Sequence, residues 1–258
     1  MPIRARLHHG CVPGSVKTEA VVLRSIRYGE ADRILHLYSA DRGRVNAIAK
    51  GSRRPKSRFG GRLEPFFRLD LMLHEGRGEL LTVTGASTLS GYPSLRSSGP
   101  AIAAAAQASE AVLRLLDSSE PNRPAYNLLC RYFDMLEGEA SPDVETPAPA
   151  PSSRAAALAF RLKLALAAGF VPELAACARC GTRDEIAAFS GIAGGVVCSG
   201  CEGAGFRLSR QAHEFMVAAL GRPLAELPEA EESALRQVER ATSDVLSHHA
   251  HVQLRAVA

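Results

Sequence analysis

The feature that most constrains the fold of this chain is a change in hydrophobic periodicity after residue 91. Before it, apolar residues alternate with polar ones, most clearly in residues 65–75. There, one face carries Phe67, Leu69, Leu71 and Leu73. After it, alanine- and leucine-rich segments place apolar residues at helical spacing. Period two is typical of strands and period 3.6 of helices, so the sequence predicts an α+β protein of more than one domain.

The first part of the chain contains five short segments with strand-like composition, separated by turn signals. They cover residues 18–28, 33–39, 44–50, 65–75 and 80–87. Five short strands in succession favour a small closed β-barrel or a sandwich. We therefore expect a β-domain over residues 17–91, preceded by a flexible N-terminal extension over residues 1–16.

The second part, residues 92–258, is predicted to be helical. Its helical segments are residues 100–117, 125–138, 154–170, 209–220 and 231–254. Between the second and third lies a segment rich in proline, alanine and acidic residues, which predicts a flexible insert over residues 139–153.

The net charge of +4 conceals an asymmetry between these parts. Residues 1–91 hold 16 basic against 8 acidic residues, whereas residues 92–258 hold 15 against 19. Such a split indicates that the N-terminal part faces a polyanion. No apolar run is long enough to span a membrane, and the N-terminus has no apolar signal-peptide core. We therefore expect a cytoplasmic protein without a membrane partner.

The basic charge is concentrated in residues 49–62, between the third and fourth predicted strands. This stretch has no acidic residue, and its cations are Lys50, Arg53, Arg54, Lys56, Arg58 and Arg62. Its glycines and proline argue against a regular helix or strand. Cations on a flexible loop beside a small barrel are typical of phosphate binding, although a merely solvated loop is the simpler alternative.

Four aromatic residues are candidates for stacking on bases: Tyr28, Tyr38, Phe59 and Phe66. Phe59 lies inside the basic loop, so it is the one that we expect to be exposed for stacking. Tyr38 and Phe66 are expected to pack in the core.

The strongest chemical motif consists of two CxxC pairs, Cys177 with Cys180 and Cys198 with Cys201. Two such pairs at this spacing suit one tetrahedral Zn²⁺ ion. Four thiolates leave no open coordination position, so the zinc would be structural. Two disulfides or a redox-active CxxC are the alternatives. The histidine-rich segment 248–251 is expected to end the last helix rather than to bind metal.

The chain resembles the bacterial RecO family of recombination mediators, in a register that covers roughly residues 17–215. In the first part the matching residues are Tyr28, Gly29, Glu30, Asp32, Lys50, Gly51, Ser52, Arg53, Arg54, Lys56, Ser57, Leu63, Pro65 and Phe66. In the second part they are Phe160, Leu162, residues 169–174, 177–181 and 194–198, Phe189 and Ser190.

The resemblance implies a five-stranded OB-fold followed by an all-α domain with an embedded Cys₄ zinc module at residues 177–201. It also implies a DNA-repair protein that binds single- and double-stranded DNA, anneals strands and helps to load RecA onto DNA coated by single-strand-binding protein. The implied partners are RecR and the tail of single-strand-binding protein, and the implied location is the nucleoid. The implied DNA contacts are Lys50, Arg53, Arg54 and Lys56; charge alone adds Arg58 and Arg62.

No catalytic motif appears, so we expect no catalytic residue and no enzymatic activity. Two other functions stay open. An enzyme acting on nucleic acid, with the zinc as scaffold, would need a converging acidic cluster, and the acids nearest to the basic loop are Glu64 and Asp70. A protein-interaction module, in which the loop only promotes solubility, would show no salt-dependent DNA binding.

Overall fold

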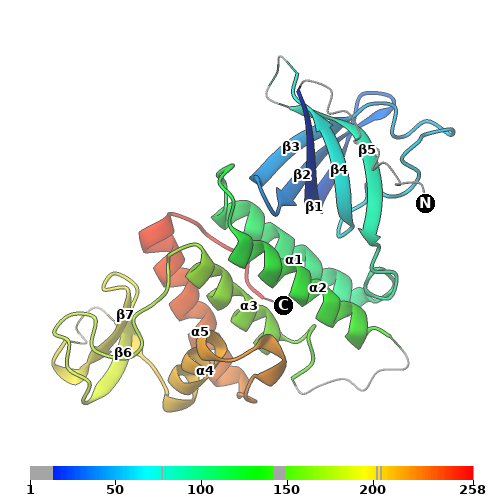
Figure 1. The fold of residues 1–258 in the computed structure, drawn as a ribbon. Helices are drawn as coiled ribbons and strands as arrows, with labels where there is room; N and C mark the ends of the chain where they lie inside the picture. The colour runs from blue at the N-terminus through cyan, green and yellow to red at the C-terminus, as the bar shows by residue number, and fades with distance from the viewer. Residues whose placement is uncertain are drawn as a thin grey trace, which may run out of the picture. The chain divides into compact units, whose positions relative to one another are not determined.

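The computed structural model describes residues 14–76, 78, 80–141, 149–201, 203 and 205–257, and it divides into two compact units between Gly91 and Tyr92. The first unit is a closed β-barrel, and the second combines five α-helices with a small three-stranded sheet (Figure 1). The change in periodicity thus corresponds to a change in architecture, and the predicted fold class is confirmed.

The barrel has five strands in the order β1-β2-β3-β5-β4. Their bounds are β1 Ser15–Tyr28, β2 Asp32–Ser39, β3 Gly43–Ala49, β4 Arg68–His74 and β5 Leu81–Ser90. All pairings are antiparallel except that of β3 with β5, which closes the barrel in parallel. Closure removes the free sheet edges that would otherwise pair with other chains.

One long strand makes this closure possible. The first half of β1 pairs with β4 and the second half with β2, and the register shifts between Val22 and Arg24. Such an irregularity bends a strand and increases its twist, so β1 can serve both sides of the barrel. The alternating residues Leu69, Leu71 and Leu73 of β4 are fully buried in the barrel core, as their period-two pattern predicts.

The five helices of the second unit begin close to the positions that the sequence pattern predicts. Their bounds are α1 Gly99–Leu115, α2 Arg123–Glu139, α3 Arg154–Ala167, α4 Arg210–Gly221 and α5 Glu232–Val245. The side chains of Ser98, Asn122, Ser153 and Ser209 each accept a hydrogen bond from a backbone N–H of the following first turn. These N-caps satisfy donors that have no partner within the helix.

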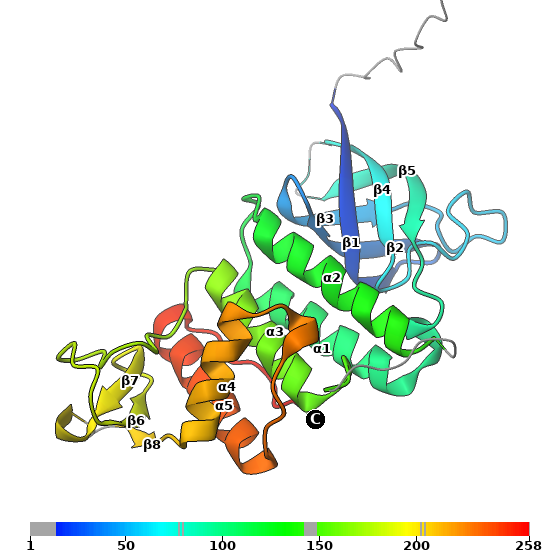
Figure 2. The same cartoon turned by 60° about the horizontal axis from the view of Figure 1, so that its bottom comes forward.

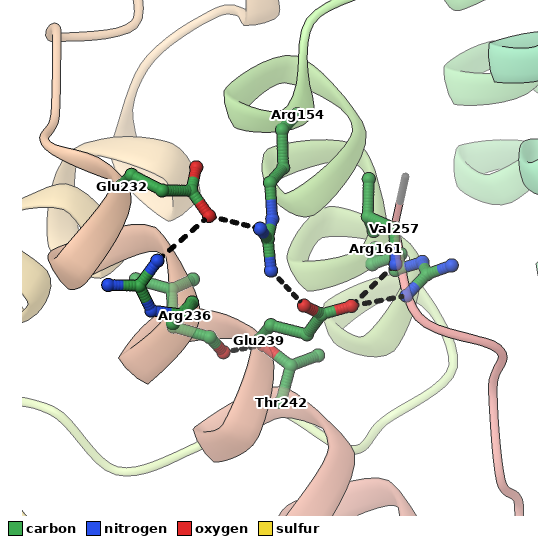
Figure 3. Close-up of polar contacts among 8 residues, drawn as sticks. Arg154, Arg161, Glu232, Arg236, Glu239, Thr242 and Val257 are labelled. Carbon is green, nitrogen blue, oxygen red and sulfur yellow. Dashed lines mark hydrogen bonds and ion pairs between the residues drawn. The ribbon is translucent and has the colours of Figure 1, made fainter.

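Helix α3 is the centre of this unit, because nearly all of its residues from Ala155 to Ala165 are buried. It contacts the other four helices. Two of its arginines form ion pairs with α5: Arg154 pairs with Glu232 and Glu239, and the buried Arg161 lies 3.7 Å from Glu239 (Figure 3). Breaking a buried ion pair leaves an uncompensated charge, so this network fixes the register of α3 against α5.

The three-stranded sheet lies between α3 and α4 in the sequence and has the order β7-β6-β8 (Figure 2). Its strands are β6 Ile186–Ser190, β7 Gly195–Cys198 and β8 Phe206–Arg207. The turn after β6 lies against the end of α5, where Gly191 would place an added Cβ 2.6 Å from Cβ of Asp244. Nε2 of His249 lies 2.9 Å from the Gly191 carbonyl oxygen, so this histidine forms part of the packing.

Two expectations about flexible segments change in the structure. Ser15 and Val16 belong to β1 rather than to a flexible extension, and the expectation for residues 1–13 lies outside the described residues. The described ends of the 139–153 insert are held in place, because Glu139 accepts hydrogen bonds from Ser152 N–H and Oγ–H. Residues 142–148 lie outside the described residues.

The last helix is shorter than predicted. α5 passes into a π-helical turn, Leu246–Ala250, and His251 adopts a left-handed conformation with φ 55° that ends it. The predicted pattern continued to residue 254 because helical spacing does not report such a terminating residue.

Candidate nucleic-acid interface and metal centre

The basic loop between β3 and β4 is an ordered run of turns. The Gly51 N–H donates to Asp32 Oδ1 at 2.7 Å, and the Arg53 N–H donates to the Ala31 carbonyl oxygen at 2.8 Å. Three further turns follow, closed by Ser57 N–H to Arg54 O, Gly60 N–H to Ser57 O and Arg62 N–H to Phe59 O. The expected flexible segment is therefore attached to the β1–β2 turn at its start.

All six predicted cations of this loop are exposed. Within the described residues none of them forms an ion pair, and the guanidinium groups of Arg53 and Arg62 donate only to backbone carbonyl oxygens. Elsewhere in the barrel the pattern is different: Lys17 pairs with Asp70, Arg33 with Glu64, Arg42 with Glu75 and Arg68 with Glu19. The loop thus presents positive charge that internal carboxylates leave uncompensated.

The expectation that Phe59 is exposed for stacking on bases is wrong. The side chain is 2% exposed and belongs to the barrel core, together with Leu63 from the same loop. Burying a phenyl ring is strongly favourable, so the loop folds over the open end of its own core. The guanidinium carbon of Arg58 lies 4.9 Å from the centroid of the Phe59 ring, a cation–π contact that helps to hold the ring in place. Tyr38 and Phe66 are buried, as expected.

An exposed surface on β1 extends this region, and Tyr28 is the one residue of it that the sequence had offered as a stacking candidate. Tyr28 is 54% exposed, Ile26 is 41% exposed, and Arg24 is also exposed. These residues alternate along the strand, so they share its outer face. Nη1 of Arg53 donates to the Gly29 carbonyl oxygen at 3.3 Å, which brings the loop next to this end of β1. The period-two spacing of the three residues was the available signal.

Asp32 holds the start of the basic loop. Its side chain accepts the Gly51 N–H, while Glu30 is exposed. A single carboxylate therefore anchors the start of the basic loop.

The two acidic residues that the sequence placed nearest to the basic loop are each taken up by an ion pair. Glu64 pairs with Arg33 at 2.7 Å and Asp70 pairs with Lys17 at 2.9 Å. Each carboxylate is therefore compensated by a cation of its own.

The four predicted metal ligands come together in one cluster. The Sγ atoms of Cys177, Cys180, Cys198 and Cys201 all lie within 4.8 Å of one another. Sγ of Cys180 lies 3.7 Å from Sγ of Cys198, far longer than the roughly 2.05 Å of a disulfide. Four sulfurs at about 2.3 Å from a tetrahedral ion would be about 3.8 Å apart. The cluster can therefore hold a metal ion, and none of the four cysteines is in a disulfide.

Two backbone turns present these thiols. In the first pair the Gly181 N–H donates to the Cys177 carbonyl oxygen at 2.8 Å, and Gly181 has φ +78°. That conformation favours glycine. In the second pair, Cys198 is the last residue of β7 and Cys201 is the last residue of the short 3₁₀ turn Ser199–Cys201. Gly200 has open space around it and no positive φ, so this turn does not require a glycine at that position.

The environment of the thiols favours a cation. Hydrogen bonds from backbone groups of Cys180 and Cys198 lower the pKa of the Cys177 thiol to about 6. Side-chain hydrogen bonds with the thiols of Cys198 and Cys180, followed by burial, raise the pKa of Cys201 to about 12. A bound cation would compensate thiolate charges and hold all four sulfurs as thiolates.

No helix in the described part of the chain is long and apolar enough to cross a membrane.

Comparison with known proteins connects both sites to one family. Residues 14–92 match the family described as Recombination protein O N terminal, and residues 96–257 match Recombination protein O C terminal. The DNA repair protein RecO of Rubrobacter xylanophilus is 40% identical over 240 residues, covering 90% of each chain. That of Geobacter sulfurreducens is 35% identical over 211 residues, covering 80% of this chain and 81% of its own. The chain belongs to the RecO family.

Proposed function

We propose that this protein is a non-enzymatic recombination mediator in DNA repair that binds and anneals single-stranded DNA through its barrel. In this proposal it also binds double-stranded DNA and helps to load RecA onto DNA coated by single-strand-binding protein. Membership of the RecO family supports the repair role. It acts in the cytoplasm, at the nucleoid, and assembles with RecR, as the family resemblance implies.

The observation that carries the proposal is the uncompensated charge of the basic loop. Six exposed cations without ion pairs in the described residues suit contacts with successive phosphates. The loop lies beside Tyr28 and Ile26, whose exposed side chains suit contact with unstacked bases. Phosphate contacts carry no base information, so binding should not depend on sequence.

The absence of an enzymatic activity is part of the proposal. The ion pairs of Glu64 and Asp70 support it, because paired carboxylates on separate cations are poorly placed for acid–base catalysis or for holding a catalytic metal. We further propose that the Cys₄ cluster holds one Zn²⁺ ion. The donor set and the sulfur separation support zinc, and a filled tetrahedral sphere makes that ion structural.

The binding site is tested by replacing Arg53, Arg54 and Lys56 together with alanine. Each phosphate contact with a single strand contributes about 0.7 to the slope of log K against log salt. Loss of three contacts should therefore reduce the slope by about 2 and weaken binding to all sequences alike. A matched variant that replaces Arg42, Arg183 and Arg222 loses the same charge outside the loop. Equal effects of the two variants would refute the loop as the site.

A pocket in the helical unit suits the tail of single-strand-binding protein. It measures about 660 Å³ and lies between α2, α3 and the turn at Leu224–Glu226. Leu128, Met135 and Leu166 give it apolar walls, and Arg131 and Lys163 supply positive charge. Its acid, Asp134, accepts a hydrogen bond from the Tyr92 hydroxyl at 2.9 Å. Burial lowers the pKa of Lys163, so a carboxylate ligand would be favourable there.

A labelled peptide with acidic residues followed by an apolar C-terminal end tests this assignment. Replacing Arg131 and Lys163 with alanine should abolish its binding and leave binding of free single-stranded DNA unchanged. The Arg183 and Arg222 double variant is the control for lost charge. Undiminished peptide binding by the pocket variant would place the tail elsewhere.

A further inference from the structure

A positively charged groove lies in the helical unit, between the edge strand β8 and helix α5. It is open, measures about 460 Å³ and is lined by Phe206, Arg207, Ser233, Arg236, Gln237 and Arg240. The α5 residues recur at spacings of three and four, so they lie on one face of the helix. The groove therefore combines one face of α5 with the end of the small sheet.

The lining residues carry three exposed arginines and no carboxylate. Arg236 lies 3.5 Å from Glu232, which also binds Arg154 (Figure 3). Arg240 lies 3.8 Å from Asp244. Exposed ion pairs four residues apart on a helix contribute little to stability. An anion in the groove can therefore compete for both guanidinium groups, and Arg207 has no ion pair within the described residues.

The groove is held in shape by its neighbours. The Arg240 guanidinium carbon lies 4.2 Å from the centroid of the Phe206 ring, and the Phe189 ring lies 5.9 Å from that ring. The Ser209 N–H donates to Gln237 Oε1 at 2.7 Å, which ties the chain after β8 to α5. Phe206 therefore positions Arg240 and is not available as a platform for a base.

We propose that this groove is a second DNA-contact site, which binds the phosphodiester backbone of a single strand through Arg207, Arg236 and Arg240. Guanidinium groups bind phosphate oxygens through pairs of parallel hydrogen bonds. Arg236 and Arg240 are separated by about 6 Å along the helix axis, a distance similar to that between neighbouring phosphates of an extended strand. The ligand class rests on the proposed DNA-binding function, but the site is separate from the barrel loop.

The test uses the full chain with Arg207 and Arg236 replaced by serine, which leaves the contact between Arg240 and Phe206 in place. Loss of two phosphate contacts should reduce the salt slope for an oligothymidylate by about 1.4. The same decrease is expected when the loop cations Arg53, Arg54 and Lys56 are already alanine. A control variant, Arg183→Ser with Arg222→Ser, loses equal charge outside the groove. An unchanged slope, or an equal change in the control, overturns the proposal.

A second measurement needs no substitution. In the unaltered protein, oligothymidylate should slow hydrogen exchange in residues 205–210 and 232–241, in addition to the barrel loop. Protection confined to the barrel would refute the groove and leave the barrel interface intact. Protection confined to the groove would refute the barrel interface and support the groove. The two proposals can therefore fail separately. A polyglutamate peptide that gives the same protection and salt slope would assign the groove to acidic protein segments and overturn the DNA assignment.

Discussion

The burial of Phe59 leads to a prediction that separates packing from DNA contact. The ring is 2% exposed and packs with the barrel core. Replacing a buried phenylalanine with alanine costs about 3–5 kcal/mol, a large part of the roughly 5–15 kcal/mol that stabilises a typical domain. Phe59→Ala should therefore destabilise the barrel severely. Phe59→Leu keeps most of the apolar volume and should cost on the order of 1 kcal/mol.

DNA binding should respond differently to the same two changes. If Phe59 only packs, Phe59→Leu leaves the affinity of the folded protein for single-stranded DNA unchanged. If it stacked on a base, the loss of the ring would cost about 1–3 kcal/mol, which is roughly a 5- to 150-fold weaker Kd. Tyr28→Leu is the matched comparison, because Tyr28 is 54% exposed and its replacement should weaken binding with little effect on stability.

Hydrogen exchange in the β1–β5 peptides of the full chain measures the stability of the barrel separately from that of the helical unit. Fluorescence anisotropy with labelled oligothymidylate measures affinity at a salt concentration held constant across the variants. The reasoning would be refuted by a Phe59→Leu variant with normal barrel exchange and a Kd weakened at least fivefold. Alanine at position 59 with normal exchange would refute the packing argument itself.

Three further predictions concern the anchors of the two sites. Asp32→Ala removes the acceptor of the Gly51 N–H, so hydrogen exchange in residues 50–57 should become faster and DNA affinity should fall. The control Glu30→Ala makes the same change in charge and should leave hydrogen exchange unaltered. Gly195→Ala would place a Cβ 2.3 Å from the Glu173 carbonyl oxygen and should destabilise the small sheet by about 1–3 kcal/mol. The change should appear as faster hydrogen exchange in β6 and β7, whereas Gly200→Ala should leave exchange unchanged. Removal of the metal with a chelator should release about one Zn²⁺ per chain and make four thiols reactive. Hydrogen exchange should then increase in β6, β7 and β8 but not in the barrel. A metal-free protein with unchanged hydrogen exchange would contradict a structural ion.

Much of the fold follows from local patterns. Leu69, Leu71 and Leu73 alternate strictly and enter the barrel core, because a strand directs successive side chains to opposite faces. Ser98 and Ser153 each precede an alanine-rich run and cap its helix, as short-range hydrogen bonding predicts. The CxxC spacing likewise predicts the thiol cluster, since two tight turns suffice to present each pair.

Other features depend on contacts between distant segments. Nothing near Phe59 in the sequence indicates burial, because polar and basic residues surround it; the ring is buried since the loop folds back over the barrel. Asp32 becomes a loop anchor only through its approach to Gly51. The alternation of Arg24, Ile26 and Tyr28 places them on one face of β1, but alternation alone does not show which face of the strand is exposed to solvent.

The sequence by itself determined the two-part architecture, the location of the basic loop and the identity of the clustered thiols, because each depends on periodicity or on spacing within a short segment. Only the tertiary structure decided which loop side chains are buried, which carboxylates pair with which cations, and that Arg207 joins Arg236 and Arg240 in one groove. Those outcomes depend on which distant segments come into contact when apolar surface is buried, and local propensity does not encode that choice.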